Sequence, residues 1–295
     1  MATIAANGIQ IEYDTFGKYG DAPLLLIAGL AMQLIHWDEA LCDQLARRGH
    51  YVIRFDNRDT GLSTQLSEAG IPDVGQIIGA RMKGEEIRPP YTIEDMADDA
   101  VGLLDALEIE KAHICGISMG GMIAQTIALN HCQRILSLIS IYSQTGNPAL
   151  APPTPKALEC LLTPPPMERE ANITYTLDVW RTFSGTGFAQ DKDWLRKIAA
   201  QAYDRAFYPE GVARQLAAVL TQKNRKPDLG SVAVPTLVIH GADDPLVPVE
   251  GGKDTAEAIP RAELIIIDGM GHDLPHGGAW PQIVDAIVNH TQKND

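Results

Sequence analysis

The chain has 295 residues, of which 45% are hydrophobic and 21% are charged, so it can bury a sizeable core and has no composition typical of disorder. Its 24 Lys and Arg residues against 38 Asp and Glu residues give a formal charge of −14. This charge would repel nucleic-acid phosphates and anionic membrane surfaces. We therefore predict one globular unit that binds neither nucleic acid nor membranes.

No stretch of the sequence has the features of a targeting or membrane-spanning segment. Residues 1–7 lack a basic start and a long apolar run, and no later apolar run reaches the ~20 residues that a bilayer requires. The cysteines form no C-x-x-C pair, which disfavours a zinc ribbon or a redox pair. We expect a cytoplasmic protein with buried free thiols at Cys42, Cys115, Cys132 and Cys160.

The first half of the chain alternates between strand and helix patterns. Residues 8–16 alternate apolar and polar side chains, as in a half-exposed strand, and residues 24–28 are continuously apolar, as in a buried one. A helix is predicted over residues 37–48 and a strand over residues 51–55, which leads into a polar loop at residues 56–63. The β-α-β order typical of a parallel sheet begins here.

The same alternation continues to residue 141. A helix over residues 92–107 is predicted to begin after Thr92 as its N-cap, with Glu94 and Asp95 in its first turn. Residues 112–115 and 135–141 read as strands, with helical patterning over residues 119–130 between them. We therefore predict an α/β fold with a mostly parallel sheet and helices on both faces.

Residues 145–230 interrupt this alternation and are predicted to form a separate cap, whereas residues 1–144 and 231–295 form the core. Seven prolines fall between Pro148 and Pro166, and amphipathic helical segments follow. Eight aromatic side chains in this insertion either form its own small core or face a substrate. They are Tyr175, Trp180, Phe183, Phe188, Trp194, Tyr203, Phe207 and Tyr208.

The alternation resumes after the insertion. Strands are predicted over residues 235–240 and 263–267, and helices over residues 253–259 and 280–290.

The segment Gly116-Ile-Ser118-Met-Gly120 has the G-x-S-x-G form and lies between a predicted buried strand and a predicted helix. In this context a tight turn lifts the serine hydroxyl above the sheet edge, and the helix N-terminus favours negative charge beside it. Ser118 is therefore the predicted nucleophile. A serine hydroxyl needs a base and an orienting carboxylate to react at neutral pH.

The predicted base is His272, because it lies directly after the strand at residues 263–267 in a loop with two glycines. His276 lies further from the strand end, and His290 is more simply a surface residue of the last helix. For the carboxylate we prefer Asp244 to Asp243, since the following proline fixes the turn after the strand at residues 235–240. Asp243 then caps the turn or faces solvent.

An oxyanion formed by attack on a carbonyl needs fixed hydrogen-bond donors. The amide after the nucleophile belongs to Met119, and a second donor normally comes from the loop after an early strand. We assign that second amide to Leu30, which follows Ala28 and Gly29.

Taken together, these residues resemble an α/β-hydrolase-fold serine esterase over nearly the whole chain. More narrowly, the strings Asp56-x-Arg-Asp-Thr-Gly-x-Ser63, Ser184-Gly-Thr-Gly187 and Gly269-Met-Gly-His-x-Leu-Pro275 are similar to the aclacinomycin methylesterase group. The resemblance implies an eight-stranded sheet with a helical cap inserted after strand 6, hydrolysis of a small-molecule carboxylic ester, and neither a metal nor an organic cofactor.

The chain departs from many such relatives at two positions. It has Ala28 where they have histidine before the glycine, and Asp59 where they have glycine. The loops that support the oxyanion hole are therefore expected to be braced differently. Asp59 is expected to be a loop carboxylate paired with Arg58 or another local donor rather than a catalytic group.

We therefore expect a serine carboxylesterase that works through an acyl-enzyme. The alternatives are a lactone or enol-lactone hydrolase, or a carbon–carbon bond hydrolase, with the same three residues. A protein that has kept the fold only to bind a ligand is a further alternative. The aromatic cap favours an apolar acyl or aromatic ester as substrate, and the patterns predict nothing about oligomeric state.

Overall fold

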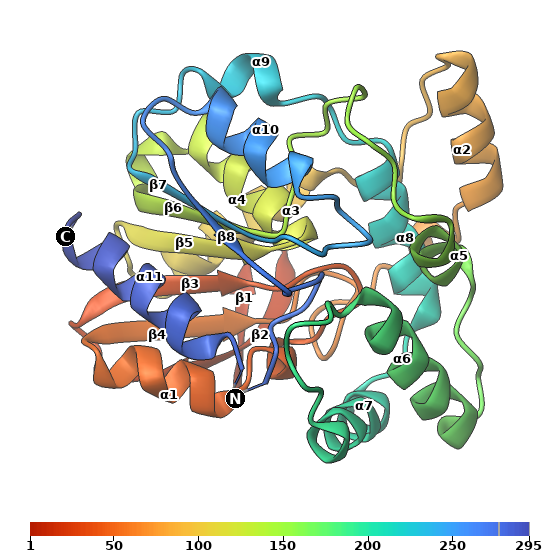
Figure 1. Ribbon diagram of the computed structural model, residues 1–295, viewed down its shortest axis with the longest axis horizontal. Coiled ribbons are helices and arrows are strands. Elements are labelled where there is room, and N and C mark those ends of the chain that lie inside the picture. Colours follow the sequence, from red (N-terminus) through yellow and green to blue (C-terminus); the bar gives the residue numbers. More distant parts are fainter. Residues whose placement is uncertain (277, 295) are drawn as a thin grey trace.

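The computed structural model describes residues 1–276 and 278–294, and its centre is an eight-stranded sheet in the order β1-β2-β4-β3-β5-β6-β7-β8 (Figure 1). The strands at the β1 edge pair antiparallel, β1 with β2 and β2 with β4, and all other neighbours pair parallel. The predicted fold class is confirmed. The strands are β1 (Ala2–Ala6), β2 (Ile9–Phe16), β3 (Ala22–Ile27), β4 (His50–Phe55), β5 (Ala112–Ile117), β6 (Ile135–Ile141), β7 (Thr236–Gly241) and β8 (Glu263–Ile267).

The continuous apolar runs form central strands because both of their faces are covered. Successive side chains of a strand point to opposite faces. Leu25 and Ile27 of β3 enter one hydrophobic cluster, whereas Leu24 and Leu26 enter the other. The first face is covered by α3 (Ile93–Ala106), α4 (Met119–Asn130) and α10 (Glu250–Ala258), and the second by α1 (Glu39–Arg47) and α11 (Trp280–Gln292) (Figure 1).

Helix α3 begins where the capping residue predicts. The Thr92 hydroxyl accepts a hydrogen bond from the Asp95 amide at 3.2 Å, and the Asp95 carboxylate accepts one from the Thr92 amide at 2.7 Å. This reciprocal capping satisfies two amides that have no partner within the helix.

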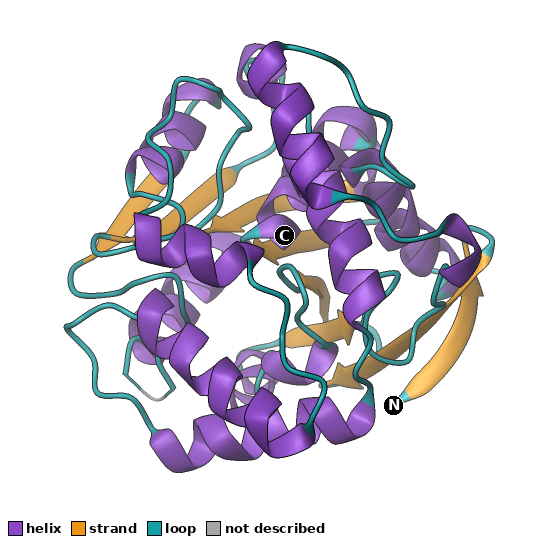
Figure 2. Cartoon of the chain, turned by 90° about the vertical axis from the view of Figure 1, so that its right-hand side faces the viewer, coloured by secondary structure: helices purple, strands orange, loops and turns teal. Residues whose placement is uncertain are grey.

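The insertion between β6 and β7 is helical, as expected. Its helices are α5 (Pro155–Leu162), α6 (Arg169–Phe183), α7 (Lys192–Arg205), α8 (Pro209–Leu220) and α9 (Lys226–Leu229). Helices α5–α8 lie together beyond one end of the sheet, the side that faces the viewer in Figure 2. Helix α9 instead packs against α4 and α10 of the core, where Lys226 bonds to Asp254 and Glu257.

Helix α2 (Val74–Lys83) and strand β1 were not individually predicted. Helix α2 buries only Ile77 and Ala80 and packs against α8, so its apolar pattern is weak and its partner is distant in sequence. Three short 3₁₀ turns complete the described elements: η1 (Leu34–His36), η2 (Ser67–Ala69) and η3 (Cys132–Arg134). Across residues 1–276 and 278–294, we find no helix that is both long and apolar enough to cross a membrane.

Two expectations about single residues were wrong. His290 is buried, because it lies on the same face of α11 as Ile283 and Ile287. The four thiols are free, but only Cys42 and Cys115 are buried; Cys132 is exposed and Cys160 is half-buried in the cap.

Candidate active site

Ser118 lies at the sharp turn between β5 and α4, in a strained backbone conformation. Its φ is 53° and its ψ is −119°, which non-glycine residues rarely adopt and which the surrounding packing must hold in place. The two flanking glycines allow this packing. A Cβ on Gly116 would collide with the Gly120 carbonyl, and a Cβ on Gly120 would collide with the Ile27 carbonyl of β3.

His272 lies between Ser118 and Asp244. Its Nε2 is 2.9 Å from the Ser118 Oγ, and its Nδ1 is 2.8 Å from the Asp244 Oδ2. An ionised carboxylate can only accept hydrogen bonds, so Nδ1 carries the proton and Nε2 is free to accept the serine proton. The structure thus brings together the three side chains that the sequence proposes from three separate turns.

Asp244 is buried in a turn that keeps it ionised. Its Oδ1 accepts hydrogen bonds from the amides of Leu246 and Val247 at 2.9 and 2.8 Å. Burial alone would raise the pKa of Asp244, but the positive charge that His272 carries when protonated and the hydrogen bonds from His240 and His272 outweigh burial and lower this pKa to about 2. The neighbouring Asp243 is exposed, as expected.

The other two histidines lie away from Ser118. His276 stacks on Trp194 at 4.6 Å between ring centroids and pairs with Asp191 at 3.1 Å. His290 is buried on the face of α11 that carries Ile283 and Ile287. Neither makes a contact with the serine in the described parts of the chain.

The backbone of the loop after β3 passes close to the serine. A Cβ built on Gly29 would lie 3.3 Å from the Ser118 Cβ. Met119 is the first residue of α4, so its amide has no acceptor within the helix. Within the described residues, neither the Leu30 amide nor the Met119 amide donates a hydrogen bond to another group.

The cap segment that ends α6 holds the histidine loop by direct backbone contact. The Phe183 carbonyl accepts a hydrogen bond from the His272 amide at 2.8 Å, and the Gly269 carbonyl accepts one from the Gly187 amide at 2.9 Å. A Cβ on Gly185 would collide with the backbone of residues 269–271. The string at residues 184–187 therefore has a structural meaning: its glycines let the two loops interlock.

A cavity of about 560 Å³ separates the core from the cap and ends at Ser118 and His272. All eight aromatic residues singled out in the cap line it, so they face the cavity rather than only one another. The pocket is of the size that encloses small organic ligands. These rings are Tyr175, Trp180, Phe183, Phe188, Trp194, Tyr203, Phe207 and Tyr208.

A few polar side chains interrupt this apolar wall. Burial lowers the pKa of His36 to about 4, so its imidazole is neutral at neutral pH. Burial raises the pKa of Asp273, which follows the predicted base directly. The Tyr142 ring lies 4.6 Å from the His272 ring, and burial raises the pKa of its hydroxyl well above the ordinary value.

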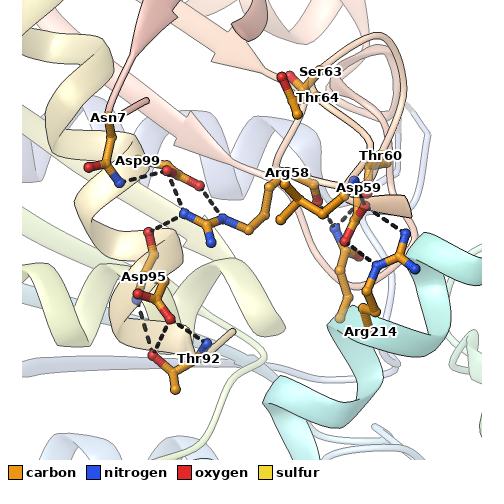
Figure 3. Close-up of polar contacts among 12 residues, drawn as sticks. Asn7, Arg58, Asp59, Thr60, Ser63, Thr64, Thr92, Asp95, Asp99 and Arg214 are labelled. Carbon is orange, nitrogen blue, oxygen red and sulfur yellow. Dashed lines mark hydrogen bonds and ion pairs between the residues drawn. The ribbon is translucent and has the colours of Figure 1, made fainter. Parts of the chain in front are cut away.

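The expected pairing of Asp59 with Arg58 is not found, although Asp59 does accept a hydrogen bond from a local donor, the Leu66 amide, at 2.7 Å. Arg58 pairs with Asp99, at 2.5 and 2.7 Å, whereas Asp59 forms a two-pronged ion pair with Arg214 of α8 at 2.8 and 2.9 Å (Figure 3). Asp59 and Arg214 are both buried. The loop after β4 is thus tied to the cap, and no local pattern in the sequence signals this because the partners are far apart in the chain.

The described residues contain no group of three or more His, Cys, Asp or Glu side chains placed to hold a metal ion. The arrangement of Ser118, His272 and Asp244 is suited to nucleophilic attack by a serine on a carbonyl carbon.

Comparison with known proteins agrees with the architecture. The family model of the alpha/beta hydrolase fold matches residues 22–279. A rhodomycin D methylesterase from Streptomyces peucetius is 29% identical, with 98% of this chain and 97% of the relative covered. The 3-oxoadipate enol-lactonase 2 from Acinetobacter baylyi is 26% identical over 97% of this chain and 96% of its own.

A solved structure, the meta-cleavage product hydrolase CumD from Pseudomonas fluorescens IP01, superposes with a TM-score of 0.74. It is 21% identical and covers 100% of this chain and 98% of its own, which establishes a common fold.

Proposed function

The chain belongs to the α/β hydrolase fold family, and we propose that it is a serine carboxylesterase with Ser118 as nucleophile, His272 as general base and Asp244 as the orienting carboxylate. The observation that carries this proposal is one imidazole within hydrogen-bond distance of both a serine hydroxyl and a buried carboxylate. The serine in its strained turn is accessible from an apolar cavity of small-molecule size.

In the proposed reaction, the Ser118 Oγ attacks the ester carbonyl carbon while its proton passes to Nε2 of His272. The carbonyl electron pair moves to its oxygen and then returns, which breaks the bond to the alkoxy group. The imidazolium gives its proton to that group, so an alcohol leaves and an acyl-enzyme remains. Water repeats the sequence and releases the acid, so every step uses only the chain, the substrate and water.

The negative oxygen of each tetrahedral intermediate is proposed to bind the Leu30 and Met119 amides. Neither amide has a partner among residues 1–276 and 278–294, and the Gly29 backbone lies close to Ser118; both observations support this assignment. A donor aimed at an oxyanion contributes about 10²-fold to 10³-fold in kcat.

The proposed substrate is an ester of a large apolar acid, with a small alcohol as leaving group. The ring-lined cavity supports the bulky apolar part, since aromatic walls bury rigid apolar ligands efficiently. The relative from S. peucetius, a methylesterase by its name, supports a methyl ester. A lactone or enol-lactone is the second candidate, favoured by the similarity to the A. baylyi enol-lactonase.

The test is a substrate panel with variants of the predicted nucleophile and base. We expect turnover of aromatic methyl and para-nitrophenyl esters, with a burst of para-nitrophenol when deacylation is slow. Ser118→Ala and His272→Ala should each lower kcat by at least about 10⁴-fold. The control variants Ser231→Ala, at an exposed serine, and His131→Ala, at a half-buried histidine that pairs with Asp98 outside the cavity, should retain most activity.

Undiminished turnover by Ser118→Ala would refute the proposal. Faster turnover of lactones than of any open-chain ester, with the same dependence on Ser118, would favour the second candidate. Saturable ligand binding without turnover would indicate a binding protein.

A further inference from the structure

We propose that Gln215 of cap helix α8 is a positioning residue for the oxyanion hole, which it serves by fixing the turn that carries the Leu30 amide. This inference rests on the proposed function. It identifies a cap side chain on which the rate of the chemical step depends, although that side chain touches neither the substrate nor the three reacting groups.

The turn at residues 29–32 has two possible orientations of its central peptide. The Met32 amide donates to the Gly29 carbonyl at 3.2 Å, which closes a four-residue turn with Leu30 and Ala31 in the centre. Ala31 has a φ of 62°, in the left-handed region that a residue with a Cβ disfavours. The peptide between Leu30 and Ala31 would flip to the commoner turn type unless an outside contact held it.

Gln215 supplies that contact. Its Oε1 accepts a hydrogen bond from the Ala31 amide at 3.0 Å, and this bond exists only when the Leu30–Ala31 peptide has the observed orientation. That peptide directly follows Leu30, the residue whose amide is the proposed oxyanion donor. Gln215 therefore holds the turn that carries this amide in its observed form.

The bonds made by the amide nitrogen of Gln215 determine that its amide oxygen faces Ala31. The Gln215 Nε2 donates to the Arg58 carbonyl at 2.8 Å and to the Thr60 hydroxyl at 2.5 Å. A flipped amide would set two donors against each other at Ala31 and two acceptors against each other at Arg58. Gln215 is fully buried, and its bonds to Arg58 and Thr60 are buried as well, so water does not replace these two bonds.

Helix α8, which carries Gln215, is anchored to the core by the residue next to the glutamine. The adjacent Arg214 forms the buried two-pronged pair with Asp59 and donates a further bond to the Gly70 carbonyl at 2.8 Å (Figure 3). The loop after β4 is itself bonded to the loop at residues 28–32, which we call the oxyanion loop. The Asn57 side chain donates a hydrogen bond to the Ala28 carbonyl at 3.1 Å. Two core loops and one cap helix thus form a single hydrogen-bonded unit around Gln215.

The test compares Gln215→Met with Gln125→Met. Methionine keeps the length of the side chain and removes all three hydrogen bonds. Gln125 is an equally buried glutamine of α4 that bonds to Ser140 and Arg225 instead of the oxyanion loop, so it controls for the loss of a buried amide. Kinetics with a para-nitrophenyl ester and inhibition by an aryl trifluoromethyl ketone, which forms a tetrahedral adduct with a serine, are measured for both.

We expect Gln215→Met to lower kcat by about 10-fold to 100-fold and to change KM by less than about threefold. This fall in kcat should not exceed the fall caused by removing one oxyanion-hole donor altogether. The inhibition constant of the ketone should rise by the same factor by which kcat/KM falls. Gln125→Met should change neither ratio by more than about threefold. If Gln215→Met does not fold, Gln215→Asn, which keeps a polar amide but withdraws it from the turn, is measured in its place.

Ala31→Gly provides a rescue that a merely structural role would not show. Glycine adopts the left-handed conformation without strain, so the turn should keep its orientation with less help from Gln215. We expect the loss caused by Gln215→Met to be smaller in the Ala31→Gly background than in the original chain. Equal losses in both backgrounds would contradict the proposal.

A raised KM with unchanged kcat, or an unchanged affinity for the ketone, would also overturn the role of Gln215. These outcomes are distinct from a failure of the proposed function. If Ser118→Ala abolishes turnover while Gln215→Met does not reduce kcat, only the positioning role is lost; if Ser118→Ala is fully active, the esterase mechanism itself is wrong.

Discussion

The loops after β5, β7 and β8 carry Ser118, Asp244 and His272, whereas cap helices α6 and α7 and the segments that follow them carry the aromatic rings that line the cavity. The core residues are held by hydrogen bonds to one another, and Ser118 is also held by the strained turn between β5 and α4. The cap residues instead line the cavity and bond to the core loops. The proposed reacting groups and the side chains that line the cavity therefore come from different parts of the chain.

The two loops that the cap supports also differ in how they are held. Backbone hydrogen bonds and closely packed glycines hold the histidine loop against residues 183–187. Side chains of α8 hold the oxyanion loop and the loop after β4, through Gln215 and Arg214. The glycine contacts leave a recognisable string in the sequence, but the side-chain contacts leave none.

The largest effect should come from a core substitution that keeps the shape of the site. Asp244→Asn removes the charge that orients His272 and allows the imidazole to adopt the wrong tautomer. We expect kcat to fall by about 10⁴-fold with the fold intact. Steady-state kinetics together with a circular dichroism spectrum test this prediction, and a fall of less than tenfold would mean that another group orients the base. Asp243→Asn, at the exposed neighbour, is the matched control and should be nearly neutral.

The next effect should appear in stability, at the contact between the two regions. Arg214→Met leaves the buried Asp59 carboxylate without its ion pair, which typically destabilises a protein by about 3–5 kcal/mol. The midpoint of chemical denaturation measures this loss. Combining Arg214→Met with Asp59→Asn should recover part of it, because no uncompensated charge then remains buried.

An exposed ion pair within the cap is the control for this prediction. Arg169→Met breaks a two-pronged pair with Asp204, at 2.7 Å for both contacts, but both side chains are largely exposed. Its loss should lower the midpoint of chemical denaturation far less than the loss of the Arg214 pair does, because water and salt screen an exposed pair. Equal destabilisation by Arg169→Met and Arg214→Met would show that burial of the Asp59 pair has no special weight.

The smallest expected effect concerns the cavity wall alone. Trp180 lines the cavity and packs its ring edge-on to His36, 5.8 Å between centroids. Trp180→Ala should raise KM for bulky aromatic esters by about tenfold, equivalent to about 1.4 kcal/mol, and change kcat by less than about threefold. An acetyl ester, which reaches little of the wall, serves as the internal control. A fall in kcat with unchanged KM would place this cap residue in the chemical step.

Sequence patterns were sufficient for the parts of the fold and site whose causes are local. The apolar run of β3, the cap at Thr92 and the glycines around Ser118 each act within a few residues, and the structure contains the corresponding strand, helix and turn. The turns of Asp244 and His272 follow strand ends, where a parallel sheet gathers its loops. The catalytic roles of these residues remain predictions for the experiments above.

The remaining features depend on residues that are distant in the chain. Arg214 and Gln215 bond to Asp59 and Arg58, each more than 150 positions away, and helix α2 is stabilised by packing on α8 rather than by its own pattern. The burial of His290 is predictable from the sequence, because its spacing from Ile283 and Ile287 is that of one helix face. The extent of the cap at residues 145–230 stays a prediction, and α9 at its end packs on the core.

The most direct test of the account is covalent trapping of the nucleophile. A fluorophosphonate ester is incubated with the protein, and the adduct is located by mass spectrometry of the digested chain. The account predicts one adduct per chain, on Ser118, with a labelling rate that falls by at least about 10³-fold in His272→Ala. An adduct on another residue, or labelling of Ser118 at the same rate without His272, would contradict the claim that this imidazole activates this serine.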